Sequence, residues 1–309
     1  MRRVGALAIL WSLLAWPTLA PTVYGASATR PIDAGGLRRT FVLHLPPSVP
    51  SGASVPLVFV LHGGGGTGAG IERQTGFSRL ADREGFIAVY PNAVDRNWND
   101  GRGDPHIRSQ AEGIDDVGFI SAVISLLSKE YRVDPKRIFA TGISNGGFMS
   151  QLLAARLSER IAAIAAVAAG MGPAVAASLQ PNAPVSVLVM NGTNDPLVPY
   201  GGGPVARNRG ETISTDEIIR KWVAANHCAG DPVAAQLPDT DPSDGTRVTK
   251  TAYSACAQQS VVVLYTIEGG GHTWPGGSQY LPRGVVGRVS RDISANEVIW
   301  AFFAAHPRP

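Results

Sequence analysis

Residues 137–157 read RIFATGISNGGFMSQLLAARL. The first five residues, Arg137–Thr141, have the apolar character of a buried strand, and Phe148–Leu157 has the composition of a helix. Between them lies GISNG (residues 142–146), in which two glycines flank a serine. Because glycine has no Cβ, the backbone can turn sharply from strand to helix and lift the serine hydroxyl above the end of a sheet. The stretch therefore predicts an α/β fold with Ser144 exposed at the carboxyl end of a strand.

Strands and helices alternate along the rest of the chain. Helical periodicity is expected around residues 77–81, 119–127 and 218–223, and capping-box spacings begin at Ser214 and Ser294. This alternation is typical of an α/β protein whose mainly parallel sheet carries helices on both faces, with functional residues at the carboxyl ends of strands. Further strands are predicted at Thr40–Leu45, Pro56–Leu61, Gly85–Tyr90, Val185–Met190 and Val261–Ile267.

The chain begins with a pattern that is typical of a secretory signal peptide. Two arginines precede an apolar run over Val4–Trp16, and small residues follow. Pro17 interrupts the run before it reaches the roughly 20 residues that a membrane span requires. We expect a signal peptide over residues 1–25, cleaved after Gly25 or as late as Ala28.

Residues 26–309 predict a single catalytic domain, because no internal repeat and no linker rich in proline, glycine or charge divides them. A composition of 44% hydrophobic and 17% charged residues excludes a disordered or collagen-like chain. Subtracting Arg2 and Arg3 with the signal peptide reduces the formal charge from +3 to +1. Since no basic run accompanies this charge, neither nucleic acid nor, after signal removal, a membrane is an expected partner. The expected location is extracellular or periplasmic.

Cys228 and Cys256 are the only two cysteines of the chain. In an oxidising compartment they have one available pairing, so a disulfide is expected, with two buried thiols as the alternative. The bond would close off residues 230–251, where an Asp-Gly pair at Asp244 followed by TRVTKTAY predicts a surface hairpin.

A serine hydroxyl is a weak nucleophile at neutral pH, so Ser144 needs a general base and an acid that orients that base. In folds with this strand–serine–helix turn, the acid and then the histidine follow the serine along the chain. Asp195 and His272 each lie on a loop directly after a predicted strand. The sequence therefore predicts Ser144 as nucleophile, Asp195 as acid and His272 as base. Weaker alternatives for the acid lie in the hairpin region, at Asp231, Asp239, Asp241 and Asp244.

A second glycine-rich loop, HGGGG at residues 62–66, follows the strand at 56–61. A loop of this kind supplies a backbone N–H to the oxyanion that develops on an attacked carbonyl, and the residue after the nucleophile supplies another. We expect Gly64 and Asn145 to be the two donors, with Gly65 as an alternative to Gly64. His62 is expected to brace the loop rather than to transfer protons.

The same glycines allow a competing interpretation, because Gly63, Gly65 and Gly68 satisfy the G-x-G-x-x-G pattern of dinucleotide-binding folds. That class requires an acidic residue at the end of the following strand to hold the ribose, and the chain has none there before Asp95. No phosphate loop, H-E-x-x-H or C-x-x-C pattern occurs either. No cofactor and no metal are therefore expected.

Several segments resemble secreted α/β-hydrolases of the polyhydroxybutyrate depolymerase and feruloyl esterase type. The resemblance implies an α/β-hydrolase fold, hydrolysis of carboxylic esters by Ser144, Asp195 and His272, and a bond between Cys228 and Cys256. Its substrates would be polyester oligomers or polysaccharides that carry hydroxycinnamoyl or other acyl groups. The matching segments are PLVFVLHGGGG (56–66), GFIAVYPNAVDRNWNDGRG (85–103), DDVGFI (115–120), RIFATGISNGGFMS (137–150), NGTNDPLVPYGG (191–202) and GGGHTWPGG (269–277).

Three functional alternatives remain open at this stage. They are an esterase of the acetyl-xylan type, a serine peptidase of related fold and, as the least supported, a binding protein without catalysis. Two tryptophans are expected to form walls of the substrate pocket: Trp98 follows a strand-end loop, and Trp274 lies two residues after His272. Packing beneath the loops is the alternative for both.

Overall fold

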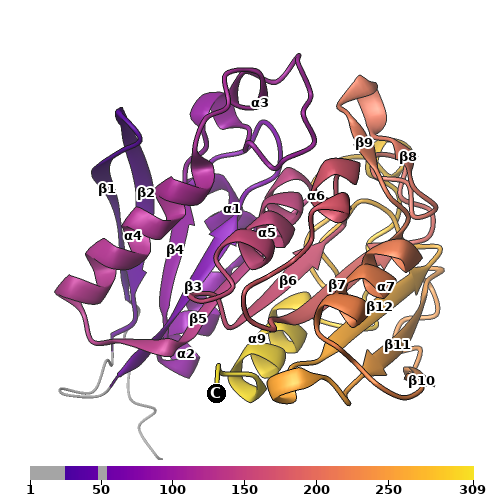
Figure 1. Ribbon diagram of the computed structural model, residues 1–309. Helices are drawn as coiled ribbons and strands as arrows, with labels where there is room; N and C mark the ends of the chain where they lie inside the picture. The colour runs from indigo at the N-terminus through magenta and orange to yellow at the C-terminus, as the bar shows by residue number, and fades with distance from the viewer. Residues whose placement is uncertain (1–24, 48–53) are drawn as a thin grey trace, which may run out of the picture.

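The computed structural model describes residues 25–47 and 54–309, so the predicted signal peptide lies outside the described residues except for Gly25. Ten strands form one sheet in the order β1-β2-β4-β3-β5-β6-β7-β12-β11-β10 (Figure 1). The six inner strands, from β4 to β12 in this order, pair in parallel. Antiparallel strands lie at both edges. The strands are β1 (Ala26–Ala34), β2 (Leu37–Leu45), β3 (Val55–Leu61), β4 (Ile87–Pro91), β5 (Val133–Ile143), β6 (Ala163–Val167), β7 (Ser186–Gly192), β10 (Val233–Gln236), β11 (Arg247–Tyr253) and β12 (Val262–Glu268).

Helices cover both faces of this sheet (Figure 1), which confirms the predicted α/β architecture. Buried side chains of α4, α5, α6 and α7 form one core with one face of the sheet, and those of α1, α2 and α9 form a second core with the other face. Among the described residues, no helix combines the length and hydropathy needed to cross a membrane. The helices are α1 (Gly68–Thr75), α2 (Phe77–Glu84), α3 (Arg108–Ala111), α4 (Asp116–Glu130), α5 (Asn145–Arg156), α6 (Pro173–Ala177), α7 (Thr215–Ala225), α8 (Arg283–Val286) and α9 (Ala295–Ala305).

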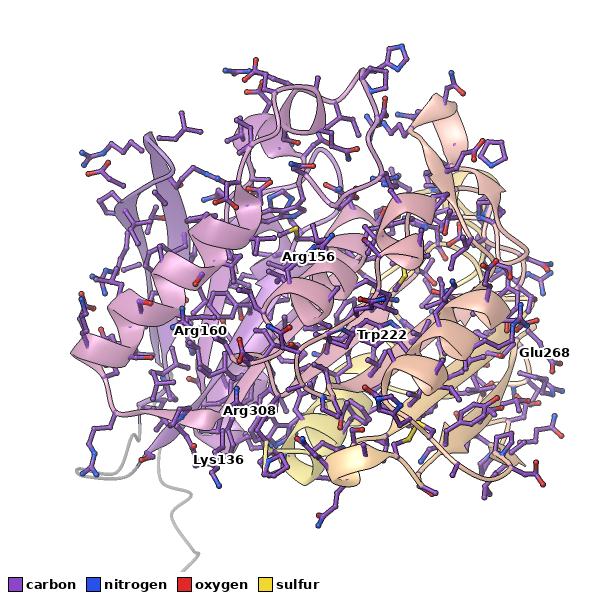
Figure 2. The ribbon with its side chains drawn as sticks, in the orientation of Figure 1. Lys136, Arg156, Arg160, Trp222, Glu268 and Arg308 are labelled. Carbon is purple, nitrogen blue, oxygen red and sulfur yellow. A yellow bond between two sulfur atoms is a disulfide. The ribbon has the colours of Figure 1, made fainter. Side chains whose placement is uncertain are left out.

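Helix α7 shows how the sequence pattern produces the packing. Ser214 caps its first turn by accepting a hydrogen bond from the N–H of Glu217, and Ile218 and Ile219 are buried one turn further on. Trp222 points from this helix into the core (Figure 2), where it is fully buried and its indole N–H donates to Gln151 Oε1 at 2.6 Å. The indole therefore has both an apolar environment and a hydrogen-bond acceptor.

Two strands of the sheet have no counterpart among the predicted strands. β6 has the sequence AIAAV, and alanine favours helices, yet the segment is fully buried between β5 and β7. β1 is mostly exposed and contains Pro31, which an edge strand can tolerate because one side of its backbone has no partner strand.

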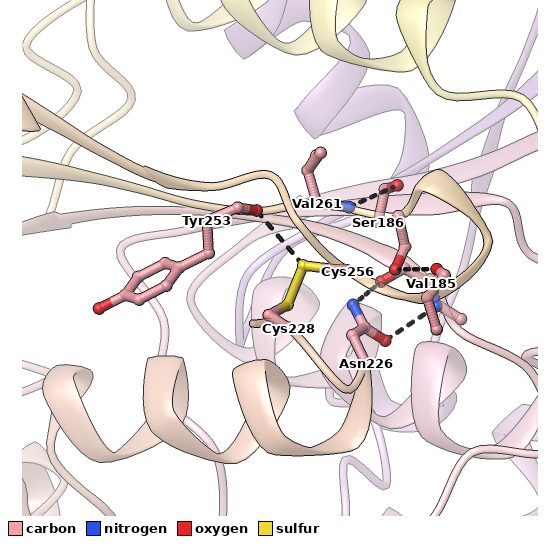
Figure 3. The surroundings of a disulfide bond; sticks show 9 residues. Val185, Ser186, Asn226, Cys228, Tyr253, Cys256 and Val261 are labelled. Atoms are coloured by element: carbon pink, nitrogen blue, oxygen red, sulfur yellow. Dashed lines mark hydrogen bonds between the residues drawn. A yellow bond between two sulfur atoms is a disulfide. The ribbon is translucent and has the colours of Figure 1, made fainter. Parts of the chain in front are cut away.

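The expected hairpin and disulfide are both present. β10 pairs with β11, and β11 pairs with β12, so the hairpin extends the main sheet instead of standing apart from it as a surface excursion. The bond between Cys228 and Cys256 joins the turn after α7 to the loop after β11 (Figure 3). Beside it, the Asn226 side-chain amide exchanges two hydrogen bonds with the backbone of Val185, at 2.7 and 3.2 Å. The region between Asp195 and His272 is thereby attached to the sheet at its base.

Candidate active site

Ser144 occupies the turn between β5 and α5, with φ 56° and ψ −127°. This region is costly for a residue with a Cβ, by roughly 1–3 kcal/mol, and is retained where the surroundings impose it. The close packing around the two flanking glycines imposes this conformation on Ser144. A Cβ on Gly142 would lie 2.6 Å from the backbone of Gly146, and one on Gly146 would lie 2.3 Å from the carbonyl oxygen of Leu61. The strand-to-helix turn therefore requires glycine at both positions.

Asp195 and His272 form a buried pair on loops that follow β7 and β12. His272 Nδ1 lies 2.8 Å from Asp195 Oδ2. The other carboxylate oxygen, Oδ1, accepts backbone N–H groups of Leu197 and Val198 at 2.7 and 2.8 Å. Since an ionised carboxylate only accepts hydrogen bonds, this geometry assigns the proton to Nδ1 and leaves Nε2 as an acceptor.

A cavity of about 410 Å³ brings the predicted site residues together. Ser144, Asn145 and His272 line it, along with the loop of residues 62–66. Asp195 lies behind His272, where its side chain is 2% exposed. The weaker candidates for the acid have other partners or lie outside the cavity: Asp239 pairs with Arg247, Asp241 pairs with Arg291, Asp244 accepts two backbone N–H groups, and Asp231 is exposed.

The backbone of the glycine-rich loop distinguishes Gly64 from Gly65. The N–H of Gly65 donates to Arg96 O at 2.8 Å and that of Gly66 donates to Gly63 O at 2.9 Å, so both are occupied. Within the described part of the chain, the N–H of Gly64 has no acceptor. Asn145 is the first residue of α5, so its N–H is one of the donors that a helix leaves without a partner in its first turn.

His62 is held inside this loop as a neutral imidazole. It is buried, Nδ1 donates to Gly63 O at 2.8 Å and Nε2 accepts the N–H of Ala93 at 3.2 Å. Burial, with a smaller contribution from Arg96, lowers the pKa of His62 to about 4. Both ring nitrogens are thus bonded: Nδ1 holds the loop's own backbone at Gly63, and Nε2 connects the loop to Ala93, after β4.

This shift predicts an acid-sensitive loop. Because the folded pKa of His62 lies below the ordinary value of 6.5, the unfolded chain binds more protons, and stability is lost as the pH falls from 6.5 towards 4. His62 alone should lower the free energy of unfolding by about 3 kcal/mol between pH 7 and pH 4. Urea unfolding of wild type and His62→Gln at both pH values measures this contribution. Equal pH dependence in the two proteins would contradict it.

The two tryptophans expected to form pocket walls do not line the cavity. Trp98 is fully buried beneath the loop: its backbone N–H donates to Asn145 Oδ1 at 2.7 Å and its indole N–H to His62 O at 2.9 Å. Trp274 is 2% exposed in the core and donates to Asn296 Oδ1 at 2.9 Å. Because both indoles are packed and bonded inside the protein, the expectation of wall residues is wrong. Both tryptophans instead pack beneath the loops, which is the alternative that the sequence left open.

A buried polar chain beside Ser144 has no distinct signal in the sequence. Asn145 Nδ2 donates to Asp100 Oδ2 at 2.6 Å, and Arg102 pairs with the same carboxylate at 2.8 Å while stacking over Phe148. The only sequence signal for it is that Asp100 and Arg102 belong to the segment 85–103. Tyr280 also reaches the cavity, and its hydroxyl donates to His272 O at 3.1 Å.

Comparison with solved structures agrees with the α/β-hydrolase architecture. The structure named sOPH is similar over 94% of this chain and 90% of its own, with a TM-score of 0.57 at 17% identity. An acetyl xylan esterase from Aspergillus awamori is similar over 77% of this chain and 92% of its own, with a TM-score of 0.53 at 14% identity. At these identities the similarity establishes the fold alone.

Sequence comparison establishes the family. The profile of the family described as esterase PHB depolymerase matches residues 39–196, which is about half of the chain, and the protein belongs to this family. NocK of Nocardia uniformis subsp. tsuyamanensis, which is named as an esterase, is 32% identical in an alignment of 287 residues that covers 89% of this chain and 81% of NocK. Feruloyl esterase C of Emericella nidulans is 26% identical over 96% of this chain and 98% of its own. The protein is accordingly a carboxylic ester hydrolase, as the sequence resemblance implied.

Proposed function

We propose that the protein hydrolyses carboxylic esters through an acyl-enzyme formed on Ser144. The observation that carries this proposal is the shared cavity of Ser144 and His272, in which a buried Asp195 holds the imidazole by a 2.8 Å contact. Nucleophile, acid and base thus follow β5, β7 and β12, three parallel strands of one sheet, in the chain order that this fold uses.

In the first half of the reaction, Ser144 Oγ attacks the ester carbonyl while His272 Nε2 takes its proton. The imidazolium is stabilised by the Asp195 carboxylate. The tetrahedral oxyanion accepts hydrogen bonds from the N–H groups of Gly64 and Asn145. Collapse of this intermediate breaks the bond to the alkoxy oxygen, which takes the proton from His272 and leaves as the alcohol.

In the second half, water replaces the alcohol. His272 removes a proton from the water as its oxygen attacks the acyl carbon, and the same two N–H groups stabilise the second oxyanion. When this intermediate collapses, the proton returns to Ser144 Oγ and the carboxylic acid leaves.

The mature enzyme is proposed to be exported as one catalytic domain. The signal pattern at the N-terminus and the disulfide between Cys228 and Cys256 support export. Cleavage after Gly25 leaves β1 complete, because this strand begins at Ala26 and pairs along its full length with β2. Cleavage after Ala28 would remove three of its residues, so we favour the earlier position.

The names of the relatives supply three substrate classes to compare: hydroxycinnamoyl esters, acetylated xylan and 3-hydroxybutyrate oligomers. Rates on methyl ferulate, acetylated xylan, a 3-hydroxybutyrate oligomer and a short acyl ester, measured side by side, test the proposal. Hydrolysis of at least one ester, with no cleavage of the amide of the same acyl group, is expected. Cleavage of the amide at a comparable rate would instead identify a peptidase-like enzyme.

The role of Gly64 leads to a separate prediction. Gly64→Pro removes the N–H itself, because proline has no backbone donor. Loss of one oxyanion donor lowers kcat by about 10²–10³-fold, and we expect this for a neutral ester. Gly64→Ala is the matched control: it keeps the N–H, and its Cβ would meet only two side-chain ends, Asn97 Oδ1 at 2.9 Å and Arg209 Nη1 at 3.0 Å. Wild-type kcat in folded Gly64→Pro would exclude Gly64 as donor.

A further inference from the structure

The cavity beside Ser144 carries positive charge that the ester chemistry does not use. Three arginines line it, Arg102, Arg207 and Arg209, and no aspartate or glutamate lies among its lining residues. Arg102 is neutralised by the buried carboxylate of Asp100 at 2.8 Å. Within residues 25–47 and 54–309, neither Arg207 nor Arg209 forms an ion pair. Two uncompensated guanidinium groups therefore belong to the wall of the cavity.

Arg209 lies beside the glycine-rich loop that is proposed to hold the oxyanion. Its Nη1 lies 3.0 Å from the position that a Cβ on Gly64 would occupy, so the guanidinium lies against the proposed oxyanion loop. The same position is 2.9 Å from Asn97 Oδ1, a buried oxygen with no hydrogen-bond partner among the described residues. Arg209 is half-buried, whereas Arg207 is exposed at the rim.

Hydrogen bonds hold the backbone segment that carries Arg207 and Arg209 against the catalytic loops. The segment 205–210 links β8 (Gly203–Pro204) to β9 (Glu211–Thr212) and projects from the molecule at the same end as α3 (Figure 1). The N–H of Ala206 donates to Leu197 O at 2.8 Å, two residues after Asp195. Arg102 Nη1 donates to Arg209 O at 3.0 Å, and Arg102 is joined through Asp100 to Asn145. The loop is thus bonded to the segment after Asp195 and, through Arg102 and Asp100, to Asn145, the residue after Ser144.

We propose that Arg209, assisted by Arg207, binds a carboxylate of the substrate, so that the preferred substrates are esters bearing an anionic group near the scissile bond. This inference rests on the proposed esterase function of the same cavity. A guanidinium binds a carboxylate through two parallel charge-assisted hydrogen bonds, which fixes orientation as well as affinity. Apolar neighbours in the cavity, including Leu197, Val198 and Val205, limit water around such a pair and strengthen it.

An anionic ester can carry its carboxylate on either side of the scissile bond, and matched substrates separate the two arrangements. On the acyl side, monomethyl glutarate is compared with the methyl ester of glutaramic acid, in which a neutral amide replaces the carboxylate. On the alcohol side, 3-acetoxybutyrate is compared with 3-acetoxybutyramide. In each pair the size of the substrate is nearly constant while the charge changes. The pair that shows selectivity identifies the side of the bond that faces Arg209.

The test measures kcat/KM for these pairs in wild type, Arg209→Gln, Arg209→Lys and Arg38→Gln. We expect wild type to prefer the carboxylate in at least one pair, and Arg209→Gln to lower kcat/KM for it by about 10- to 30-fold, chiefly through KM. The neutral amide should change less than about twofold. Arg209→Lys should restore part of the preference, because it keeps the charge but not the bidentate geometry. Arg38→Gln removes the same charge from an exposed hairpin and should change neither substrate.

Equal rates for carboxylate and amide in wild type would overturn the proposal, as would an equal loss for both in Arg209→Gln. The second result would assign Arg209 to holding the oxyanion loop. Either result leaves the proposed esterase function standing as long as the neutral esters are hydrolysed in a Ser144-dependent manner. Absence of hydrolysis of all four esters would instead contradict the esterase function, and the carboxylate inference would fall with it.

Discussion

Replacing Ser144 by alanine is expected to lower kcat for a short acyl ester by at least about 10⁴-fold, with the protein still folded. The substitution removes the only atom that forms the acyl bond, whereas His272, Asp195 and the two oxyanion donors stay in place. The residual rate then reflects only substrate binding and attack by water at the oxyanion site. Initial rates with a nitrophenyl ester, measured at enzyme concentrations high enough to detect the residual rate, give the ratio of wild-type to variant kcat.

Ser254→Ala is the matched control, since Ser254 is exposed and lies outside the cavity of Ser144. It should retain wild-type kcat. Thermal unfolding of both variants establishes that the comparison is made between folded proteins. If Ser144→Ala kept more than a few per cent of wild-type activity, another group would have to be the nucleophile.

Asp195→Asn should have the second largest effect, a loss of about 10³–10⁴-fold in kcat with little change in fold. Asp195 Oδ1 accepts two backbone N–H groups, from Leu197 and Val198. An asparagine keeps these bonds by placing its single oxygen there, which turns its NH₂ group towards His272 Nδ1. Because Nδ1 must then accept, the proton moves to Nε2, and the imidazole can no longer take the proton of Ser144.

Asp231→Asn provides the control for this change. Asp231 is one of the four weaker alternatives for the acid, and it is exposed and outside the cavity, so the variant should behave as wild type. Rates at neutral pH and unfolding midpoints of both variants are the measurements. A fall in activity with Asp231→Asn, or none with Asp195→Asn, would reverse the assignment of the acid.

The central part of the fold is predictable because its signals are local. Long β-branched runs identify β3, β7 and β12, and the capping serines Ser214 and Ser294 identify the starts of α7 and α9. β6 escapes prediction because alanine carries no strand signal, and only pairing with β5 and β7 makes the segment extended. The same reason applies to β1, which becomes a strand by pairing along the edge of the sheet.

Part of the candidate site can be predicted from the sequence, and part of it is visible only in the structure. Ser144, Asp195 and His272 can be proposed from sequence because each follows a recognisable strand, and parallel strands bring their carboxyl ends to one edge. The choice of Gly64 over Gly65 needs coordinates, since it depends on which N–H is already bonded to Arg96 O. Burial also cannot be read from composition, and for this reason the sequence wrongly predicts Trp98 and Trp274 on the pocket wall. Arg209 lies in a turn with no regular pattern, so its position against Gly64 is visible only in the structure.

The most direct test of Ser144 as the nucleophile is covalent labelling by a fluorophosphonate, which loses fluoride and phosphonylates a serine activated by a working base. Peptide mapping after labelling should find one adduct per chain, on Ser144, and preincubation with a hydrolysable ester should slow its formation. Ser144→Ala should remain unlabelled, and Asp195→Asn should react far more slowly than wild type. An adduct on another residue, or a folded wild-type enzyme that hydrolyses esters without being labelled, would contradict the assignment of Ser144 as the nucleophile.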